Sequence, residues 1–522
     1  MDSSIAATLL LKLLLGSVLP TASADRNGIS ARDIYEEMEH ILVDNKGTNS
    51  DGLVNAITPC SNYINGDDTD GEQSSAQWVR IAFHDIATAD VAAGTGGLDA
   101  SVGFESNRPE NPGLFINQTI GFFNPDVSAY VSMADMLALG VVASVATCGG
   151  TTTDIPLRTG RVDASAAGPS GVPEPGTDID TTLSSFAAAG FDQSEAIALT
   201  ACGHSLGRTH YTNFPDIVDE SYVTTDNTDG GQEFDSTPAV FDSAVVTEYL
   251  DQTGEKGGPL VTTTNETQRS DFRLYNSDQN ATIESLAASE DSFQTQCNTL
   301  FAKMIDTVPS DVVLSDPITP MPWKATDIGL DISSSGSVSV AGLIRNLYGA
   351  SESAASSVSY TYTANGTNSS AVETTGSAGS GSSLYGTTAW YNFNTTIESP
   401  GTTALNINSA ISYPINVDIF VLPAKSSTNT RSGTVTLYAA ALSNIATDSD
   451  TMTATFYVAT SQTGSRANTV TTKTVTLTES GAAGAYTLYT ASATGLSSIG
   501  DVIVKVSMGD YASQTVKTSI FG

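Results

Sequence analysis

Histidine is the residue in this sequence best suited to acid–base chemistry, and the chain contains only four: His40, His84, His204 and His210. His84 follows Arg80 by four residues in the run Q-W-V-R-I-A-F-H-D, so a helix would place both on one face. A neutral imidazole beside a fixed guanidinium suits cleavage of an O–O bond. The base moves a proton from one oxygen to the other, and the cation stabilises the leaving oxyanion. The alternative interpretation is an amphipathic helix with a polar edge.

The segments around His84 and His204 resemble those of a known family. R-x-x-F-H-D at residues 80–85 resembles the distal haem motif of the plant–fungal–bacterial peroxidase superfamily, and G-H-S-L-G-R at residues 203–208 resembles its proximal motif. The resemblance implies that Arg80 and His84 form the distal pair, with Phe83 packed over haem b. It also implies that His204 binds the haem iron. The remaining histidines are interpreted as structural.

The resemblance assigns a partner to each haem-site histidine. Asn111, in the segment P-E-N-P-G-L, takes the place of the asparagine that hydrogen-bonds the distal histidine, with Asn107 as a nearby competitor. Such a partner leaves the other ring nitrogen free to act as a base. An iron-bound histidine needs an acceptor for its second N–H, which the family supplies from an S-D segment. The segment R-L-Y-N-S-D-Q matches, so we assign Asp278 to this role.

Two calcium sites, one beside each histidine, are implied by the same resemblance. Oxygen ligands of this kind suit Ca²⁺. The first set uses side chains and one glycine carbonyl: Asp85, Gly97, Asp99 and Ser101. The second set uses side chains and one valine carbonyl: Ser205, Asp235, Thr237, Val240 and Asp242. Short Asp/Thr clusters otherwise indicate turns, but their position favours calcium ions that fix the helices carrying the histidines.

Two substrate sites of the secreted fungal relatives are missing from the sequence. The acidic residues that bind Mn²⁺ beside a haem propionate are replaced by Gln73, Gln77 and His210. The surface tryptophan of lignin-type enzymes is replaced by Leu199. We therefore expect neither Mn²⁺ oxidation of that type nor electron relay through that tryptophan.

Two further positions bear on the haem and its donors. Phe234 precedes Asp235 where the intracellular class usually has a tryptophan that can hold a protein radical. The resemblance then implies that the second oxidising equivalent stays on the porphyrin. Pro173, in the segment G-V-P-E-P, would border the entrance for small substrates. The expected donors are small phenols or dyes that react at the haem edge.

Helical patterns supply the elements that must position these residues. Ile34, Met38, Ile41 and Leu42 share one face of a predicted helix over residues 33–42. Similar patterns predict helices over residues 127–139, 181–189 and 292–305. The predicted fold class is therefore a mainly helical haem domain over residues 25–322, with the haem between distal and proximal halves.

Residues 323–522 have a different character and predict an all-β sandwich domain. From residue 330 onward they contain no Cys or His, and short runs alternate with period two. Gly376–Ser383 is interpreted as a flexible loop or linker. Trp390, Tyr391 and Phe393 would form either a carbohydrate-binding platform or part of the core, and we favour the core. The domain would alternatively be a spacer or a brace on the haem domain.

Four cysteines are too few to hold a small fold together, but they permit two disulfides. The resemblance implies a bond between Cys60 and Cys148, with an insertion between Cys60 and His84. Cys202 either pairs with Cys297 or is a buried thiol.

The remaining features indicate a secreted protein. Residues 1–24 combine a short apolar run with the small-residue site Ala22-Ser23-Ala24, as in a signal peptide. Six N-x-[ST] sequons follow, at Asn117, Asn265, Asn280, Asn365, Asn368 and Asn394. A formal net charge of −36 opposes electrostatic binding to nucleic acid or an anionic membrane.

Taken together, these features predict a secreted fungal-type haem peroxidase that uses hydrogen peroxide and small aromatic reductants, binds two Ca²⁺ ions and is a monomer. The alternative is a non-catalytic secreted protein, or a cell-wall protein, whose β domain binds a polysaccharide or lignin surface. Intact Arg80, His84, His204 and Asp278 favour the enzyme, because a decayed site tends to lose at least one such residue.

Overall fold

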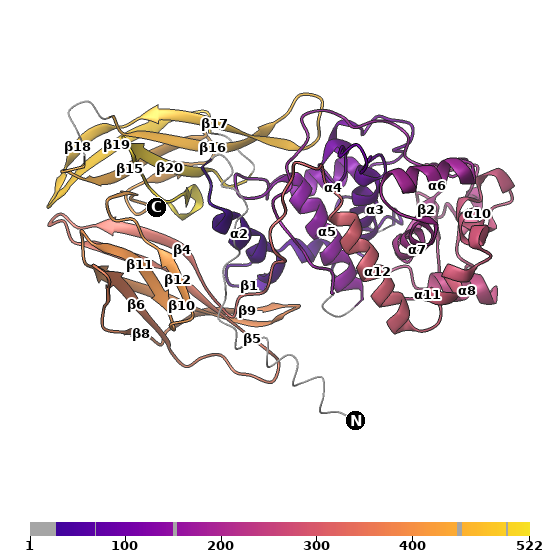
Figure 1. Cartoon of the computed structure of the whole chain (residues 1–522), viewed down its shortest axis with the longest axis horizontal. Helices are drawn as coiled ribbons and strands as arrows, with labels where there is room; N and C mark the ends of the chain where they lie inside the picture. The colour runs from indigo at the N-terminus through magenta and orange to yellow at the C-terminus, as the bar shows by residue number, and fades with distance from the viewer. Residues whose placement is uncertain (1–27, 68, 150–153, 446–450, 497–499) are drawn as a thin grey trace.

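The computed structural model describes residues 28–67, 69–149, 154–445, 451–496 and 500–522. The predicted signal peptide lies outside these residues. The described chain divides into a helical N-terminal part and a C-terminal part made of β strands, as Figure 1 shows. This arrangement confirms the predicted fold class.

The helical part contains the four predicted helices and both helices expected around the haem-site histidines. Its α-helices are α2 (Ala31–Val43), α3 (Ser74–Ile86), α4 (Phe115–Phe123), α5 (Met133–Cys148), α6 (Ile179–Ala188), α7 (Gln193–Gly203), α8 (Ala244–Asp251), α9 (Pro259–Thr262), α10 (Ser270–Tyr275), α11 (Ala281–Leu286) and α12 (Glu290–Ile305). A small hairpin joins β2 (Arg208–His210) to β3 (Gly231–Glu233).

One predicted helix begins later than its sequence pattern suggested. Residues 127–132 are not helical, and α5 starts at Met133 because the side chain of Ser132 accepts a hydrogen bond from Asp135 N. Beyond this cap nearly every residue of α5 is buried. The apolar content of Val127 to Val131 therefore reflects burial in a loop rather than a helical face.

The β part forms two sandwiches rather than the single one predicted. The first encloses a core between two antiparallel sheets. One sheet has the order β1 (Lys46–Gly47), β9 (Ser377–Ser383), β10 (Gly386–Ile397), β5 (Val338–Tyr348) and β4 (Trp323–Ile332). The other has the order β12 (Ile411–Pro414), β11 (Thr402–Ile407), β6 (Val358–Ala364) and β7 (Thr367–Asn368), with β8 (Val372–Thr374) also paired to β6.

The second sandwich encloses a separate core. One of its sheets has the order β13 (Ile419–Val421), β15 (Thr434–Leu442), β19 (Tyr486–Ala493) and β18 (Thr478–Ala483), with β14 (Ser427–Asn429) paired to β15. The other has the order β17 (Asn468–Thr476), β16 (Thr453–Ser461), β20 (Ile503–Met508) and β21 (Tyr511–Ala512), with β22 (Val516–Lys517) paired to β20.

The segment Gly376–Ser383 is mostly a strand, so the loop prediction was wrong. Its residues 377–383 form β9, which lies between β10 and β1 of the helical part. The approach is close: a Cβ on Gly381 would lie 2.2 Å from the carbonyl oxygen of Lys46. Glycine is therefore needed here so that the two strand backbones can approach closely. A run of Gly and Ser in the sequence does not distinguish this requirement from a flexible loop.

The aromatic residues considered as a carbohydrate platform lie in the protein interior. Trp390, Tyr391 and Phe393 are 0%, 3% and 3% exposed. All three lie on β10, in the middle of its sheet. The preferred interpretation as core residues is therefore confirmed.

Buried charges join the two parts of the molecule. On α2, Glu39 is fully buried and pairs with Lys324 of β4, at 2.8 Å, and with Arg345 of β5. Arg345 also donates to Asp44 at 2.7 Å. Burial would raise the pKa of Glu39, but the charges of Arg345 and Lys324 outweigh it and lower that pKa to about 2. The helix α2, beside β4 in Figure 1, is therefore held to the first sandwich by ion pairs excluded from water.

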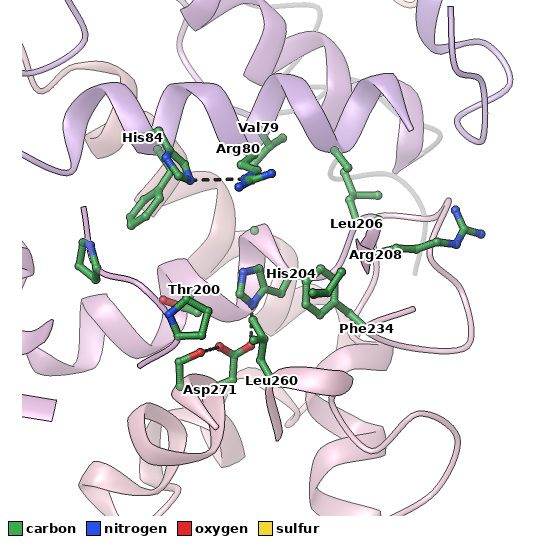
Figure 2. Close-up of a pocket in the computed structure, with 18 of the residues that line it drawn as sticks. Val79, Arg80, His84, Thr200, His204, Leu206, Arg208, Phe234, Leu260 and Asp271 are labelled. Carbon is green, nitrogen blue, oxygen red and sulfur yellow. Dashed lines mark hydrogen bonds and ion pairs between the residues drawn. The ribbon is translucent and has the colours of Figure 1, made fainter. Parts of the chain in front are cut away.

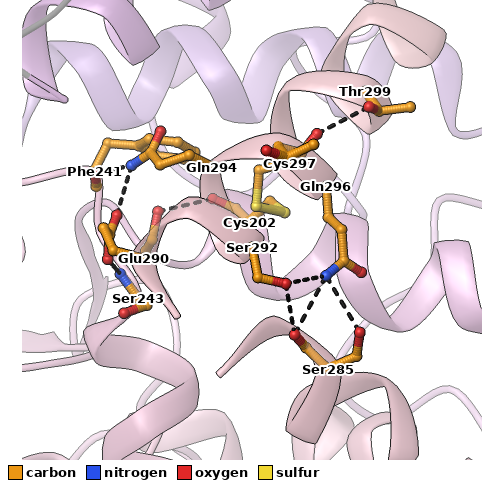
Figure 3. The surroundings of a disulfide bond; sticks show 12 residues. Cys202, Phe241, Ser243, Ser285, Glu290, Ser292, Gln294, Gln296, Cys297 and Thr299 are labelled. Carbon is orange, nitrogen blue, oxygen red and sulfur yellow. Dashed lines mark hydrogen bonds between the residues drawn. A yellow bond between two sulfur atoms is a disulfide. The ribbon is translucent and has the colours of Figure 1, made fainter. Parts of the chain in front are cut away.

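Two disulfides account for all four cysteines. Cys60 pairs with Cys148, as the resemblance implied, and Cys202 pairs with Cys297, which resolves the open alternative. Figure 3 shows the second bond between α7 and α12, where both cysteines are buried. This bond fixes the helix that leads to His204 onto the long C-terminal helix of the helical part.

Candidate active site

His84 and His204 face each other across one cavity of about 430 Å³. Helix α3 forms one wall, and the C-terminal end of α7 forms the opposite wall (Figure 2). Arg80 and Phe83 of α3 also line this space, as do Pro173 and Phe234. The structure thus brings together residues that the sequence separates by up to 154 positions, from Arg80 to Phe234.

The distal histidine is oriented by the asparagine predicted for it. His84 Nδ1 lies 2.7 Å from Asn111 Oδ1, and Asn111 Nδ2 donates to the carbonyl of Glu105 at 3.1 Å. Because the amide is held in this orientation, its oxygen must accept from His84 Nδ1, which therefore carries the proton. The lone pair is left on Nε2, where Arg80 Nε lies 3.4 Å away. Asn107, the competing candidate, is exposed.

Burial keeps the imidazole of His84 neutral. Burial first, and then the charge of Arg80, lower the pKa of His84 to about 3, against a smaller opposing effect of the Asn111 hydrogen bond. Burial also lowers the pKa of Arg80 to about 10, so the guanidinium stays charged at neutral pH. Phe115 packs against both side chains. Its ring centroid lies 4.0 Å from the guanidinium carbon Cζ of Arg80 and 4.8 Å from the ring centroid of His84.

On the opposite wall, His204 caps the C-terminus of α7 and is held on two sides. Its Nδ1 lies 2.6 Å from Asp271 Oδ2, which leaves Nε2 available for a metal. The ring of Phe234 stacks on it at 4.4 Å with an interplanar angle of 3°. The predicted neighbour Phe234 is therefore in contact with His204, but the carboxylate is not the predicted one.

Asp278 was the wrong choice of partner for His204. Two S-D pairs stand seven residues apart in this segment, Ser270-Asp271 and Ser277-Asp278. Asp278 Oδ2 instead accepts from the backbone N–H and the hydroxyl of Thr282, at the start of α11. Asp271 lies in the first turn of α10, which packs against α7, and this long-range packing decides between the two pairs.

The first predicted calcium set surrounds one buried carboxylate. Asp85 accepts from the backbone N–H groups of Asp99, Ala100 and Val102 at 2.7–2.8 Å, and from the Ser101 hydroxyl at 3.4 Å. Burial, followed by the charge of Asp99, raises the pKa of Asp85 well above its usual range. The two carboxylates are thus close enough for the charge of one to raise the pKa of the other. Gly97 adjoins this loop, with a φ of +115° that favours glycine.

The second set carries a clearer sign of a missing partner. Asp235 is fully buried, and its Oδ2 has no hydrogen-bond partner. Burial, together with the charges of Asp242 and Glu248, raises the pKa of Asp235 to about 7, although the Thr237 N–H opposes this. The Thr237 hydroxyl lies 3.1 Å from Asp242 Oδ1. An orphaned carboxylate oxygen beside a second carboxylate and a hydroxyl fits an oxygen-ligated cation.

The remaining residues of the second set lie on neighbouring segments. Ser205 is buried directly after His204, and the same turn bonds to the 235–242 loop through Gly207 N and Pro238 O, at 2.9 Å. Val240 lies within that loop. The described residues contain no group of three or more His, Cys, Asp or Glu side chains arranged for a metal. A cation at either predicted set would therefore need hydroxyl and carbonyl oxygens as well as carboxylates.

The three positions that correspond to the Mn²⁺ ligands of the fungal relatives lie at the cavity wall. Gln73, Gln77 and His210 all line it. Sequence reasoning missed Glu72, which also lines it, accepts from Gln77 Nε2 at 3.1 Å and lies 3.9 Å from His210. Glu72 was not considered because it lies one residue before Gln73, the position that corresponds to an Mn²⁺ ligand. Leu199, at the position of the surface tryptophan, is 3% exposed.

Comparisons with known proteins agree with this geometry. The family model described as Peroxidase matches residues 63–289. A "WSC domain-containing protein" of Arthroderma benhamiae is 40% identical over 306 residues, which cover 58% of this chain and 41% of the relative. Manganese peroxidase 3 of Phlebia radiata is 32% identical over 179 residues, 32% of this chain and 44% of the relative.

A third relative is Versatile peroxidase VPS1 of Pleurotus eryngii, which is 30% identical over 182 residues, 33% of this chain and 45% of the relative. The chain thus spans less than half the length of each of these three relatives. The two named peroxidases match about a third of the chain, whereas the family match covers the segment that holds both histidines.

Proposed function

We propose that the protein is a secreted haem peroxidase, since residues 63–289 match the Peroxidase family model. It reduces hydrogen peroxide and oxidises small phenolic or dye-type donors by one-electron steps. The observation that carries this proposal is the pair of opposed histidines: neutral His84, oriented by Asn111, and His204, backed by the carboxylate of Asp271.

Haem b would be held by His204 Nε2 and would supply the electrons that peroxide reduction consumes. The residues of the distal wall handle protons and charge. His84 Nε2 accepts a proton from one peroxide oxygen and delivers it to the other, because its own proton is fixed on Nδ1 by Asn111. The guanidinium of Arg80 stabilises the negative charge on the departing oxygen.

The cavity also indicates which donors it admits. Pro173 and Pro175 line it together with Glu110 and Glu174. Glu110 is fixed by the N–H of Gly171, at 2.9 Å, and by an ion pair with Arg108. Two carboxylates among rigid prolines favour neutral or cationic aromatic donors over anionic ones. Because Gln73, Gln77 and His210 replace an acidic cluster, Mn²⁺ oxidation of the family type is not part of the proposal.

Calcium is proposed at both predicted sets, with the set around Asp235 better supported by its unpartnered oxygen. Secretion is proposed from the signal-peptide pattern and the sequons, of which Asn265, Asn365, Asn368 and Asn394 are exposed. No described helix has the length and apolarity to cross a bilayer.

The β part is proposed as a brace for the haem domain. The aromatic trio of β10 is buried, so nothing at those residues favours a polysaccharide or lignin surface as a partner. By contrast, α2 is bound to the first sandwich by buried ion pairs, and Asn124 exchanges hydrogen bonds with residues 466 and 468 of the second. Both sandwiches therefore contact the helical part directly.

Steady-state turnover of the haem-loaded protein with hydrogen peroxide tests the proposal. We expect oxidation of a neutral phenol and of a cationic aromatic amine, with a lower kcat/KM for a sulfonated dye. Glu174→Gln should raise kcat/KM for the sulfonated dye relative to the phenol.

His84→Ala should retain haem while turnover falls by about two to four orders of magnitude. Turnover that is unaffected by His84→Ala would contradict the role given to this base.

A further inference from the structure

A buried phenol shares the carboxylate that holds His204. Tyr275 lies one turn after Asp271 on α10 and is 0% exposed. Its hydroxyl donates to Asp271 Oδ2 at 3.5 Å, the same oxygen that accepts the N–H of His204 at 2.6 Å. The other oxygen, Oδ1, accepts from the Ser270 hydroxyl at 3.0 Å. Asp271 is thus an acceptor for three donors, and two of them compete for one oxygen.

Among the described residues, Asp271 is the only group that accepts a hydrogen bond from the Tyr275 hydroxyl. Tyr249 meets the Tyr275 ring edge-to-face at 5.3 Å, and the Tyr249 hydroxyl donates away from it, to Asn280 Oδ1 at 3.0 Å. Burial, followed by the charge of Asp271, raises the pKa of Tyr275 well above its usual range, so its hydroxyl keeps the proton. Tyr275 is therefore a permanent hydrogen-bond donor toward Asp271.

We propose that Tyr275 is a positioning residue that limits how strongly Asp271 draws on the N–H of His204, and so sets the reduction potential of the iron that His204 holds. The proposal rests on the proposed haem site. A hydrogen bond to a carboxylate oxygen withdraws negative charge from it. A weaker acceptor leaves the imidazole less anionic, and a less anionic ligand stabilises the oxidised metal less.

The geometry of His204 explains why the effect should be electronic rather than steric. The imidazole is stacked on Phe234 with nearly parallel rings and is bonded to Asp271 on one edge. Removal of the Tyr275 hydroxyl leaves both contacts in place. The distal residues Arg80 and His84 lie across the cavity, outside this network.

The test is the midpoint potential of the haem-loaded full chain in three variants. Tyr275→Phe removes the hydroxyl, and we expect a shift to more negative potential, with a higher iron–histidine stretching frequency in the ferrous protein. Replacement of Tyr275 by 3-fluorotyrosine strengthens the donor and should shift the potential in the positive direction. Tyr249→Phe is the matched control, because it removes a neighbouring phenol that does not touch Asp271, and it should leave the potential unchanged.

The outcomes separate this proposal from the one on which it rests. A potential unchanged in Tyr275→Phe, or shifted in the same direction by both Tyr275 replacements, would overturn the role of Tyr275. An equal shift in Tyr249→Phe would overturn it as well, by showing a general packing effect. Failure of the wild-type chain to retain haem would instead refute the proposed function.

Discussion

At the scale of single residues, the distal wall depends on one amide to make His84 a base. Asn111→Ala removes the acceptor of the Nδ1 proton, so the tautomer with a free Nε2 loses its preference. We expect the second-order rate constant for hydrogen peroxide to fall by about one to two orders of magnitude. Stopped-flow measurement checks this. Asn107→Ala, at an exposed asparagine of the same loop, serves as the control and should have no effect.

The lowered pKa of His84 predicts an unusual pH profile. With a pKa of about 3, the base is neutral at all higher pH values, so the rate constant for peroxide should be level above about pH 4. Below about pH 3 it should fall about tenfold per pH unit. The unfolded chain binds this proton more readily, so the free energy of unfolding should decrease as the pH falls from about 6.5 toward 3. A fall in the rate constant for peroxide centred near pH 6.5 would contradict the buried environment assigned to His84.

Residue identity could be predicted where one motif dictated it, and not where two copies competed. Arg80 and His84 stand together in one motif, R-x-x-F-H-D, and Asn111 was preferred to its competitor Asn107 by its place in P-E-N-P-G-L. Asp271 could not be chosen over Asp278, because both follow a serine and only the packing of α10 on α7 separates them. Tyr275 gave no signal, since its role depends on the contact of Asp271 with His204, 67 residues away in sequence. Glu72 gave none either, since its neighbour His210 is also distant in sequence.

At the scale of elements, the loop that carries Asp235 should respond to calcium. Without the ion, the raised pKa of Asp235 means that the folded state holds a proton that the unfolded state releases. The free energy of unfolding should therefore fall as the pH rises from about 4 to 7. Calcium should restore it, with an increase in Tm of several degrees at pH 8. Differential scanning calorimetry with and without a chelator measures both effects.

A matched variant isolates this site. Asp235→Asn removes the charge without changing the shape of the side chain, so the calcium-free protein should be more stable at pH 8 and should lose most of its response to calcium. An undiminished calcium response in this variant would show that the ion binds elsewhere.

Element boundaries were predictable where caps and periodicity agreed. The helices predicted over residues 33–42 and 292–305 match α2 and α12 to within two residues at each end. The strand β9 was not predictable, because a run of Gly and Ser has no alternating pattern. It forms because β1 and β10 supply partners on both sides, and the small residues permit the close approach.

At the scale of the whole molecule, the brace predicts that one cation on β5 stabilises both parts. Arg345→Ala leaves Glu39 and Asp44 buried with too little positive charge, and should reduce the free energy of unfolding by about 3–5 kcal/mol. Urea denaturation of the full chain measures this loss. Arg269→Ala is the control: it removes an ion pair with the 85% exposed Glu266, at 4.0 Å, and one hydrogen bond to the Thr263 carbonyl, at 2.6 Å, so it should cost only about 1–2 kcal/mol. Equal losses of unfolding free energy in Arg345→Ala and Arg269→Ala would contradict the proposal that the β part braces the helical part.

The division of the chain into a helical and a β part followed from composition and periodicity alone. The presence of two sandwiches did not, because period-two runs show strands but not which strands share a core. The contact between the two parts was also hidden. Glu39, Asp44, Lys324 and Arg345 are unremarkable charges in the sequence and become a network only when α2 packs on β4 and β5.

The central claim is that His204 holds a haem iron opposite the base His84. The most direct measurement is the absorption spectrum of the calcium-replete, haem-loaded chain before and after one equivalent of hydrogen peroxide. We predict a Soret band that shifts within milliseconds in the wild type and only slowly in His84→Ala. Failure to retain haem, or a Soret band that peroxide leaves unchanged in the wild type, would contradict the account.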